Sequence, residues 1–402
     1  MKLYRNLVQA VVQALRDIFE DAQYADKVIE RVLKSNPKWG ARDRAFIAEN
    51  VYELVRWYRL LYELDGKPPK EEADWWRLFG TWQILQGHSL PPWEEFKKLN
   101  PKAILENRKK VKSVRKIEES IPDWLDERAF RELDVTWEPV LHALNEPAEV
   151  VLRVNTLKMD KLALQQLLKA EGVDTEPLDG DALRVTQRKN LFSTQSFKQG
   201  YFEVQDYASQ QVAPFLQAEP GMRVIDACAG GGGKALHLAA LMQNKGRIIS
   251  MDTEGWKLDE LKRRSRRAGV DIIETRPIDS TKVIKRLEGS ADRLLLDVPC
   301  SGLGVLRRNP DAKWKLDVPF IERVRQTQQE ILRSYSRMLK PGGLMVYATC
   351  SILPSENEQQ VEAFLKEQKG KFELVRSQHL LPNEFGYDGF FMALLAAHKP
   401  QP

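Results

Sequence analysis

The chain has 402 residues, of which 43% are hydrophobic and 30% charged, a composition typical of soluble globular proteins and too long for one ordinary core. The net charge of +5 permits a nucleic-acid partner without requiring one, because 62 basic residues are interspersed with 57 acidic ones. Three cysteines argue against a disulfide framework, and the chain shows neither a signal-peptide pattern nor an apolar run of about 18 residues. We therefore expect a cytoplasmic protein of two or three domains with no membrane partner.

The N-terminal part has the spacing of helices. Apolar residues recur every three or four positions over 3–19 and again within 42–64, which predicts two amphipathic helices. Glycine and proline in 65–69 interrupt this pattern, and an aromatic-rich stretch over 75–85 predicts another buried helix. These patterns predict an all-helical domain over residues 1–130.

A basic segment follows this helical pattern. It contains Lys97, Lys98, Lys102, Arg108, Lys109, Lys110, Lys112, Arg115 and Lys116. Two interpretations are open: a solvated, partly flexible connector, or a surface that contacts RNA phosphates.

Residues 131–205 change to a mixed pattern that predicts a small α+β domain. Strands are expected at 150–155, 182–185 and 201–204, and an amphipathic helix at 160–172.

From residue 206 onward strands alternate with helices, which predicts an α/β domain with a doubly wound parallel sheet over 206–402. The strands are expected at 224–226, 247–252, 272–277, 293–297 and 343–348, with a closing strand at 390–395.

A glycine-rich turn follows the first of these strands. Asp226 ends the strand, Gly230 to Gly233 form the turn, and Lys234 opens a helix, so backbone N–H groups can approach an anion or a carboxylate. The turn is not a Walker loop, because Ala235 follows the lysine, and it does not match the dinucleotide fingerprint. Cys228 lies within the turn and is assigned no chemistry.

Acidic residues stand at the ends of the next strands. Asp252 is placed to accept hydrogen bonds from ribose hydroxyls, Asp279 to meet a base edge, and Asp297 ends the fourth strand. Each alone could be a helix N-cap, but the series favours a nucleoside site.

Cys300 and Cys350 occupy nearly matching positions. Each follows a hydrophobic strand and precedes a serine, in the sequences Pro-Cys-Ser-Gly and Thr-Cys-Ser. Because ligands of open α/β sheets bind at the carboxyl ends of the strands, both thiols can face one crevice. This arrangement favours covalent chemistry on a base.

Three motifs carry a family resemblance: the turn over 226–234, the segment 297–304 with its tail over 307–315, and the segment 347–358. Together they resemble the Sun (Fmu) family of RNA cytosine C5-methyltransferases, most closely its RsmB-like branch that acts on 16S ribosomal RNA. The resemblance runs from about residue 150 to 399, and the helical block around 42–46 is similar to that branch's NusB-like domain. Gly230 and Gly231 depart from the Ala-Pro usual in the family's turn.

The resemblance implies a Rossmann-like class I methyltransferase domain, an RNA-binding NusB-like N-terminal domain, and S-adenosylmethionine as the cofactor. It implies that Cys350 attacks carbon 6 of cytosine, that Cys300 assists breakdown of the adduct, and that Asp297 holds the base, with Lys234 nearby. The implied cofactor contacts are Cys228, Ala229, Gly230, Gly231, Gly232, Gly233, Lys234, Asp252, Asp279 and Asp297. The expected substrate is a single-stranded or flipped-out cytosine, and we expect a monomer without a metal.

Three alternatives stay open. The chain could be a ribosome-assembly or RNA-binding factor that has lost turnover, or it could perform the same chemistry on tRNA. A nicotinamide dehydrogenase is the third, although it leaves the two Cys-Ser turns unexplained.

Overall fold

The computed structural model describes residues 2–187 and 189–399, which divide into two compact units. One unit contains the chain up to Glu146 together with residues Leu306–Asp317, and the other contains Pro147–Val305 and the chain from Val318 onward. Across the described residues, no helix is long and apolar enough to cross a membrane.

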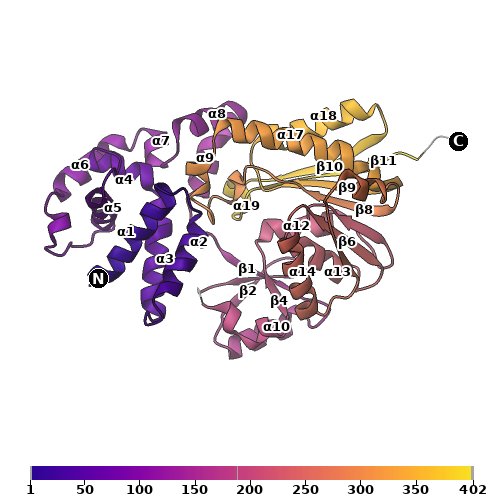
Figure 1. The fold of residues 1–402 in the computed structure, drawn as a ribbon, viewed down its shortest axis with the longest axis horizontal. Helices are drawn as coiled ribbons and strands as arrows, with labels where there is room; N and C mark the ends of the chain where they lie inside the picture. The colour runs from indigo at the N-terminus through magenta and orange to yellow at the C-terminus, as the bar shows by residue number, and fades with distance from the viewer. Residues whose placement is uncertain (1, 188, 400–402) are drawn as a thin grey trace. The chain divides into compact units, whose positions relative to one another are not determined.

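The first unit is entirely helical, as the sequence predicts (Figure 1). Its core is formed by apolar residues of α1, α2, α3 and α5 and includes the fully buried Trp75 and Phe79. The elements are α1 (Arg5–Phe19), α2 (Ala25–Ser35), α3 (Ala41–Arg56), α4 (Tyr58–Asp65), α5 (Glu72–Leu85), η1 (Glu94–Phe96), α6 (Pro101–Val111), α7 (Arg115–Glu118), α8 (Asp123–Leu133), η2 (Asp134–Thr136), α9 (Trp137–Leu144) and α16 (Ala312–Lys315).

The helical unit differs from the prediction in three places. The single helix expected over 42–64 is two helices, because Trp57 leaves helical geometry at φ −100° and ψ 17°. The basic segment is ordered as α6 and α7, and Asn100 caps α6 by accepting a hydrogen bond from the Ala103 N–H. The unit extends beyond residue 130 through α9, where the Trp137 Nε1–H donates to Asp126 at 2.8 Å.

The second unit begins with the small α+β domain. Its four strands form an antiparallel sheet in the order β2-β3-β1-β4, and Leu164 and Leu168 of α10 pack against the sheet. The elements are β1 (Val150–Val154), α10 (Lys161–Ala170), β2 (Thr175–Pro177), β3 (Ala182–Val185), η3 (Leu191–Ser193), α11 (Gln195–Lys198) and β4 (Phe202–Val204). The short β2 was not predicted.

The rest of the unit is a Rossmann-like domain with a seven-stranded sheet in the order β10-β11-β9-β8-β5-β6-β7. Helices α12, α13 and α14 cover one face, and α17 and α18 cover the other (Figure 1). The elements are α12 (Tyr207–Phe215), β5 (Arg223–Asp226), α13 (Gly233–Leu241), β6 (Arg247–Asp252), α14 (Gly255–Ala268), β7 (Ile273–Pro277), α15 (Thr281–Lys285), β8 (Ala291–Asp297), η4 (Leu303–Val305), α17 (Val318–Tyr335), η5 (Ser336–Met338), β9 (Leu339–Thr349), η6 (Pro354–Glu356), α18 (Glu358–Gln368), β10 (Phe372–Leu380), α19 (Pro382–Phe385) and β11 (Phe390–Ala397).

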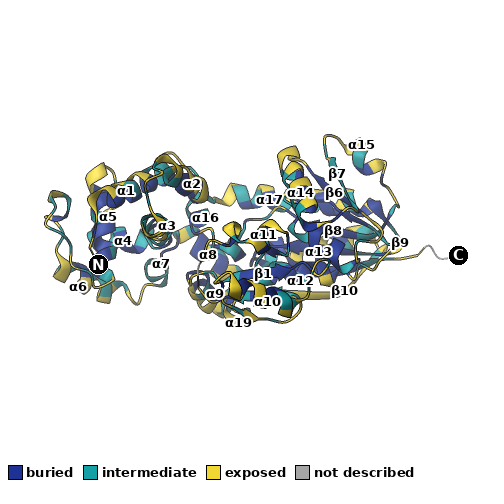
Figure 2. Ribbon diagram, turned by 90° about the horizontal axis from the view of Figure 1, so that it is seen from below, coloured by how far each residue is buried: buried dark blue, intermediate teal, exposed yellow. Residues whose placement is uncertain are grey.

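The sheet confirms the doubly wound prediction for β5 to β9, which are parallel, but β11 runs in the opposite direction. β11 runs antiparallel to both β9 and β10, since the short connection from β10 to β11 permits only an antiparallel pair. β10 was not predicted, because its side chains are mostly exposed and lack an apolar pattern. The central strands, by contrast, are buried on both faces (Figure 2).

Candidate active site

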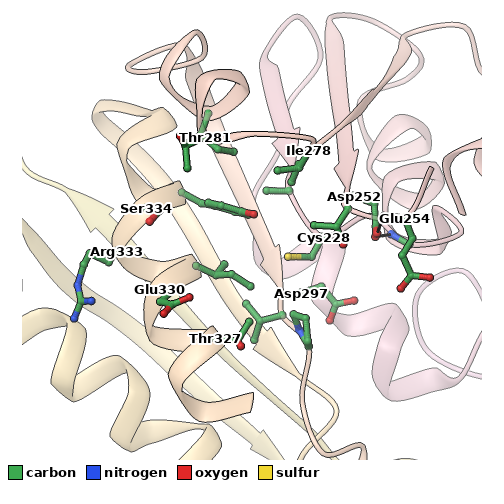
Figure 3. A pocket seen from close by; sticks show the side chains of 18 of the residues that line it. Cys228, Asp252, Glu254, Ile278, Thr281, Asp297, Thr327, Glu330, Arg333 and Ser334 are labelled. Atoms are coloured by element: carbon green, nitrogen blue, oxygen red, sulfur yellow. Dashed lines mark hydrogen bonds between the residues drawn. The ribbon is translucent and has the colours of Figure 1, made fainter. Parts of the chain in front are cut away.

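A cavity of about 830 Å³ opens at the carboxyl ends of the parallel strands in the second unit. Residues at or just after the ends of β5, β6, β8 and β9 line it, as do residues of α17. Figure 3 shows Cys228, Asp252 and Asp297 on one side of this space and Thr327, Glu330 and Ser334 on the other. Ligands of open α/β sheets bind at this edge, so the cavity is the candidate site.

The glycine-rich turn passes tightly from β5 into α13. Gly232 has φ +82°, and a Cβ on it would lie 2.0 Å from Leu261 Cδ1, so only glycine fits there. The Gly230 N–H donates to Asp252 Oδ2 at 2.8 Å, and the other Asp252 oxygen accepts from the Glu254 N–H at 2.9 Å. Asp252 therefore joins the ends of β5 and β6.

Two arginines support the same turn from outside. The Arg264 Nη1–H donates to the Gly231 carbonyl at 2.7 Å, and Arg153 of β1 donates to the Gly233 carbonyl at 2.5 Å. Glu203 of β4 accepts from Arg264 at 2.9 Å. The small domain thus braces a turn in which glycine replaces the Ala-Pro expected from the family pattern. No spacing or motif in the sequence indicates these hydrogen bonds.

The structure brings only part of the predicted cofactor set to the cavity surface. Cys228, Gly230, Asp252 and Asp297 line it, whereas Ala229, Gly231, Gly232, Gly233 and Lys234 form the turn and helix start behind it. Asp279 is exposed and is not a lining residue, although its neighbours Ile278 and Thr281 are.

Other lining residues were missed from the sequence. Glu254 follows Asp252 closely, and Ile331 and Tyr335 come from α17, about a hundred residues after the glycine turn. Helical periodicity predicts which face of such a helix is apolar, but not which cavity that face reaches. The apolar wall beside the Asp252 and Glu254 carboxylates fits a nucleoside, whose base is apolar on its faces and whose ribose donates hydroxyls.

The two predicted thiols meet in this cavity. Cys300 and Cys350 both line it, and their Sγ atoms are 3.2 Å apart. Beside them the Lys234 ammonium donates to Asp297 Oδ2 at 2.6 Å, which brings together the four residues singled out for chemistry in the sequence.

The charges around the thiols shift several pKa values. Burial by itself would lower the pKa of Lys234, but the negative charges of Asp297, Cys350 and Asp226 outweigh burial. The pKa of Lys234 is therefore raised above its ordinary value, and the side chain is a charged ammonium. The hydrogen bond to Cys350, together with burial and the negative charge of Glu356, holds the pKa of Cys300 well above its ordinary value. Burial, aided by Asp297, raises the pKa of Asp226 to about 7.

This arrangement suits nucleophilic chemistry on a polar ring. A cation–carboxylate pair beside two thiols can hold a hydrogen-bonding base edge and offset charge that develops on it. The described residues contain no group of three or more His, Cys, Asp or Glu side chains that could hold a metal ion.

Comparisons with known proteins agree with this geometry. The model of the 16S rRNA methyltransferase RsmB/F family matches residues 213–396, and that of the RsmF/B-like ferredoxin-like domain matches residues 121–191. The chain is 32% identical to a "Probable ribosomal RNA small subunit methyltransferase B" from Synechocystis, over 95% of this chain and 97% of that protein. It is 29% identical to ribosomal RNA small subunit methyltransferase B from Klebsiella pneumoniae, over 99% of this chain and all of that protein.

A solved structure extends the similarity to the whole fold. The crystal structure of PH0851 superposes with a TM-score of 0.83 at 25% identity, covering 98% of this chain and 99% of that one. The dehydrogenase alternative is therefore wrong, and S-adenosylmethionine is the cofactor. The chain belongs to the RsmB/F family of S-adenosylmethionine-dependent ribosomal RNA methyltransferases.

Proposed function

We propose that the chain methylates carbon 5 of a cytosine in ribosomal RNA through a covalent adduct between Cys350 and carbon 6 of the base. The observation that carries this proposal is the pair of thiols 3.2 Å apart, next to the Lys234–Asp297 pair and inside the cofactor cavity. A single thiol could form the adduct, but its breakdown requires a second group at the same place.

The chemistry explains why a thiol is needed. Carbon 5 of cytosine is a poor nucleophile, and addition of the Cys350 thiolate to carbon 6 pushes an electron pair towards carbon 5. At the N3/N4 edge of the base the Asp297 carboxylate accepts a hydrogen bond from the N4 amino group, and the Lys234 ammonium offsets the negative charge that develops on the ring. The turn after β5 and Asp252 would hold S-adenosylmethionine, which would supply the electrophilic methyl group for carbon 5.

Release needs a base at carbon 5. The Cys300 thiolate takes the proton from the methylated carbon 5, the electron pair re-forms the ring double bond, and the Cys350–carbon 6 bond breaks. Cys350 leaves as a thiolate and Cys300 is again the neutral thiol that it was at rest. Cys300 gives up its own proton to solvent before it acts as the base, and this is the one proton released per turnover, because a methyl group replaces one hydrogen on carbon 5.

The cavity also constrains the RNA. A base stacked in a duplex cannot reach the thiols that line this cavity, so the target is single-stranded or flipped out. We propose that the helical N-terminal unit contacts the same RNA, and that the enzyme acts as a monomer in the cytoplasm.

Methyl transfer from labelled cofactor to unmodified 16S ribosomal RNA tests the reaction. Cys350→Ala should abolish transfer, while Cys300→Ala should accumulate a protein–RNA species that survives denaturant. Mapping the labelled nucleotide by bisulfite sequencing then identifies the cytosine.

Each alternative has its own outcome in this experiment. Transfer to tRNA and not to ribosomal RNA would redirect the proposal to the tRNA substrate. RNA binding with bound cofactor but without transfer to either RNA would favour the assembly factor. Absence of the covalent species from both cysteine variants would contradict the assigned roles.

A further inference from the structure

The two Cys-Ser turns have the same hydrogen-bonding pattern, which the proposed reaction does not explain. Ser301 follows Cys300, and its Oγ accepts a hydrogen bond from the N–H two residues ahead at 3.4 Å. Ser351 follows Cys350, and its Oγ accepts from the corresponding N–H at 3.2 Å. Both serines are buried and neither lines the cavity, so they do not contact substrate from these positions.

One carboxylate joins the two turns. Glu356 Oε1 accepts from the Ser301 N–H at 2.7 Å, and Oε2 accepts from the Ser301 hydroxyl at 2.5 Å and from the Ser351 hydroxyl. Gln328 of α17 adds a bond to Oε1 at 3.3 Å and another to the Pro299 carbonyl at 2.9 Å. Glu356 therefore contacts the residue that follows each cysteine.

Burying the Glu356 carboxylate would cost free energy if these donors were absent. Its exposed fraction is 0%, and no Lys or Arg of the described residues forms an ion pair with it. A buried carboxylate is tolerated when hydrogen bonds replace its hydration, and here four neutral donors from three segments do so. An apolar side chain could fill this space equally well. Packing alone therefore does not explain a buried carboxylate that is held by four hydrogen-bond donors.

The backbone around Glu356 is itself tied to the strand that carries the nucleophile. The Tyr347 hydroxyl donates to the Glu356 carbonyl at 2.6 Å, and Asn357 accepts from the Thr349 hydroxyl at 2.5 Å. Asn357 also donates to the Ser351 carbonyl at 3.0 Å. These bonds fix the position of the Glu356 carboxylate relative to β9. The same carboxylate binds Ser301, in the turn that follows β8.

We propose that Glu356 is a positioning residue that sets the relative placement of Cys300 and Cys350 through Ser301 and Ser351. This inference rests on the proposed function, in which the two thiols act on opposite steps at one base. Attack and proton removal each require the thiol within near-attack distance, and small displacements cost large factors in rate. Each serine arm should govern the step performed by the cysteine that precedes it.

Single-turnover kinetics on the full-length protein separate the two arms. Ser351→Ala should slow appearance of the covalent adduct about tenfold, because it loosens the attacking thiol. Ser301→Ala should leave adduct appearance near the wild-type rate and slow its breakdown about tenfold, so that the adduct accumulates. Glu356→Gln should slow both steps, and cofactor affinity should change less than about twofold in all three variants.

Ser336→Ala is the matched control. Ser336 is also buried, but its hydroxyl donates to the Arg333 carbonyl at 3.5 Å, away from the two turns. It should leave both rates unchanged. If Ser301→Ala and Ser351→Ala slow both steps alike, or if neither slows any step, the positioning role is overturned while the covalent mechanism stands.

Thiol alkylation without RNA keeps the inference testable should the proposed reaction fail. Mass spectrometry of iodoacetamide-treated protein gives the separate rates for Cys300 and Cys350. Glu356→Gln removes one of the negative charges that disfavour the Cys300 thiolate, so Cys300 should react severalfold faster than in the wild type at the same pH. Unchanged relative reactivity of the two thiols in the serine and Glu356 variants overturns the role, whatever the enzyme's substrate.

Discussion

At the scale of single residues, the two thiols are chemically unequal although their turns match. Cys300 has a pKa well above its ordinary value, because it is hydrogen-bonded to Cys350, buried, and close to the Glu356 charge. It is therefore a neutral thiol at pH 7 and a better hydrogen-bond donor than base. This suits a group that first donates to Cys350 and acts as a base only after the adduct has formed.

The raised pKa predicts how the release step depends on pH. In the adduct Cys350 is a thioether and no longer raises the pKa of Cys300 as a thiolate would, but burial and the Glu356 charge still raise it. Below that pKa the thiolate fraction of Cys300 rises about tenfold for each pH unit, so the rate of adduct breakdown should rise with the same slope from about pH 7 to 9. Pre-formed adduct, shifted to buffers of different pH and quenched over time, gives this rate. The Cys300→Ala variant should show no such slope, and a flat profile in the wild type would contradict the assignment of Cys300 as the base.

The same substitution, glycine to alanine, should lower the free energy of unfolding by different amounts at two positions of the glycine-rich turn. Gly232→Ala places a Cβ at φ +82° and 2.0 Å from Leu261 Cδ1, whereas Gly230→Ala, at φ +52°, meets no atom within 4 Å. We expect Gly232→Ala to lower the free energy of unfolding by about 3 kcal/mol or more, and Gly230→Ala by only about 1 kcal/mol. Urea unfolding measures both, and equal losses would show that the contact with Leu261 can relax.

At the scale of elements, the sequence predicted most strands of the Rossmann-like domain because buried parallel strands are short, continuous apolar runs. It predicted the meeting of Cys300 with Cys350, since both follow strand ends at one edge of the sheet. It did not predict α17 as a cavity wall or Glu356 as the link between the turns. Those depend on long-range packing: Gln328 and Glu356 are 28 residues apart, and nothing in their spacing indicates contact.

The segment Leu306–Asp317 is the least predictable element, since it follows the Cys300 turn but belongs to the helical unit. Within that unit the Trp314 Nε1–H donates to the Val55 carbonyl at 2.7 Å, and its ring meets Tyr58 edge-on at 5.4 Å. The buried Asp311 accepts from the Ala25 N–H at 3.0 Å. Trp314 therefore completes the core of the helical unit, and Asp311 ties the motif to the start of α2.

This packing predicts that Trp314→Ala destabilises the helical unit. Loss of the ring and its hydrogen bond should lower the free energy of unfolding of this unit by about 2–4 kcal/mol. Calorimetry with and without cofactor measures it, and cofactor affinity should not change because the cavity residues all lie in the other unit. Val135→Ala, at a side chain 79% exposed in the same unit, is the control, and a loss as large there would contradict a specific role for Trp314.

At the scale of the whole molecule, the mild net charge of +5 conceals an uneven distribution. In the segment around α6, some basic residues are neutralised, as Arg108 is by Glu118 and Lys116 by Asp123. Others are exposed and have no ion-pair partner among the described residues: Lys98, Lys102, Lys109, Lys110 and Lys112. Lys102, Lys109 and Lys110 lie on α6 and Lys112 directly follows it, so these charges extend from a helix and not from an irregular segment, which favours the phosphate-contacting interpretation over the flexible connector.

Neutralising this surface distinguishes the two interpretations. With Lys102, Lys109, Lys110 and Lys112 changed to Gln, RNA binding should weaken, and the slope of log affinity against log salt should fall by about 0.7–0.9 for each RNA phosphate that these lysines neutralise in the wild type. Cofactor affinity should stay unchanged, since none of these lysines lines the cavity. Lys27→Gln with Lys34→Gln is the matched control, because both lysines are exposed but paired, with Asp26 and Glu30. A solvated surface that does not touch RNA would leave the slope as steep as in the wild type. A smaller slope in the α6 variant alone would show that the helical unit binds part of the RNA.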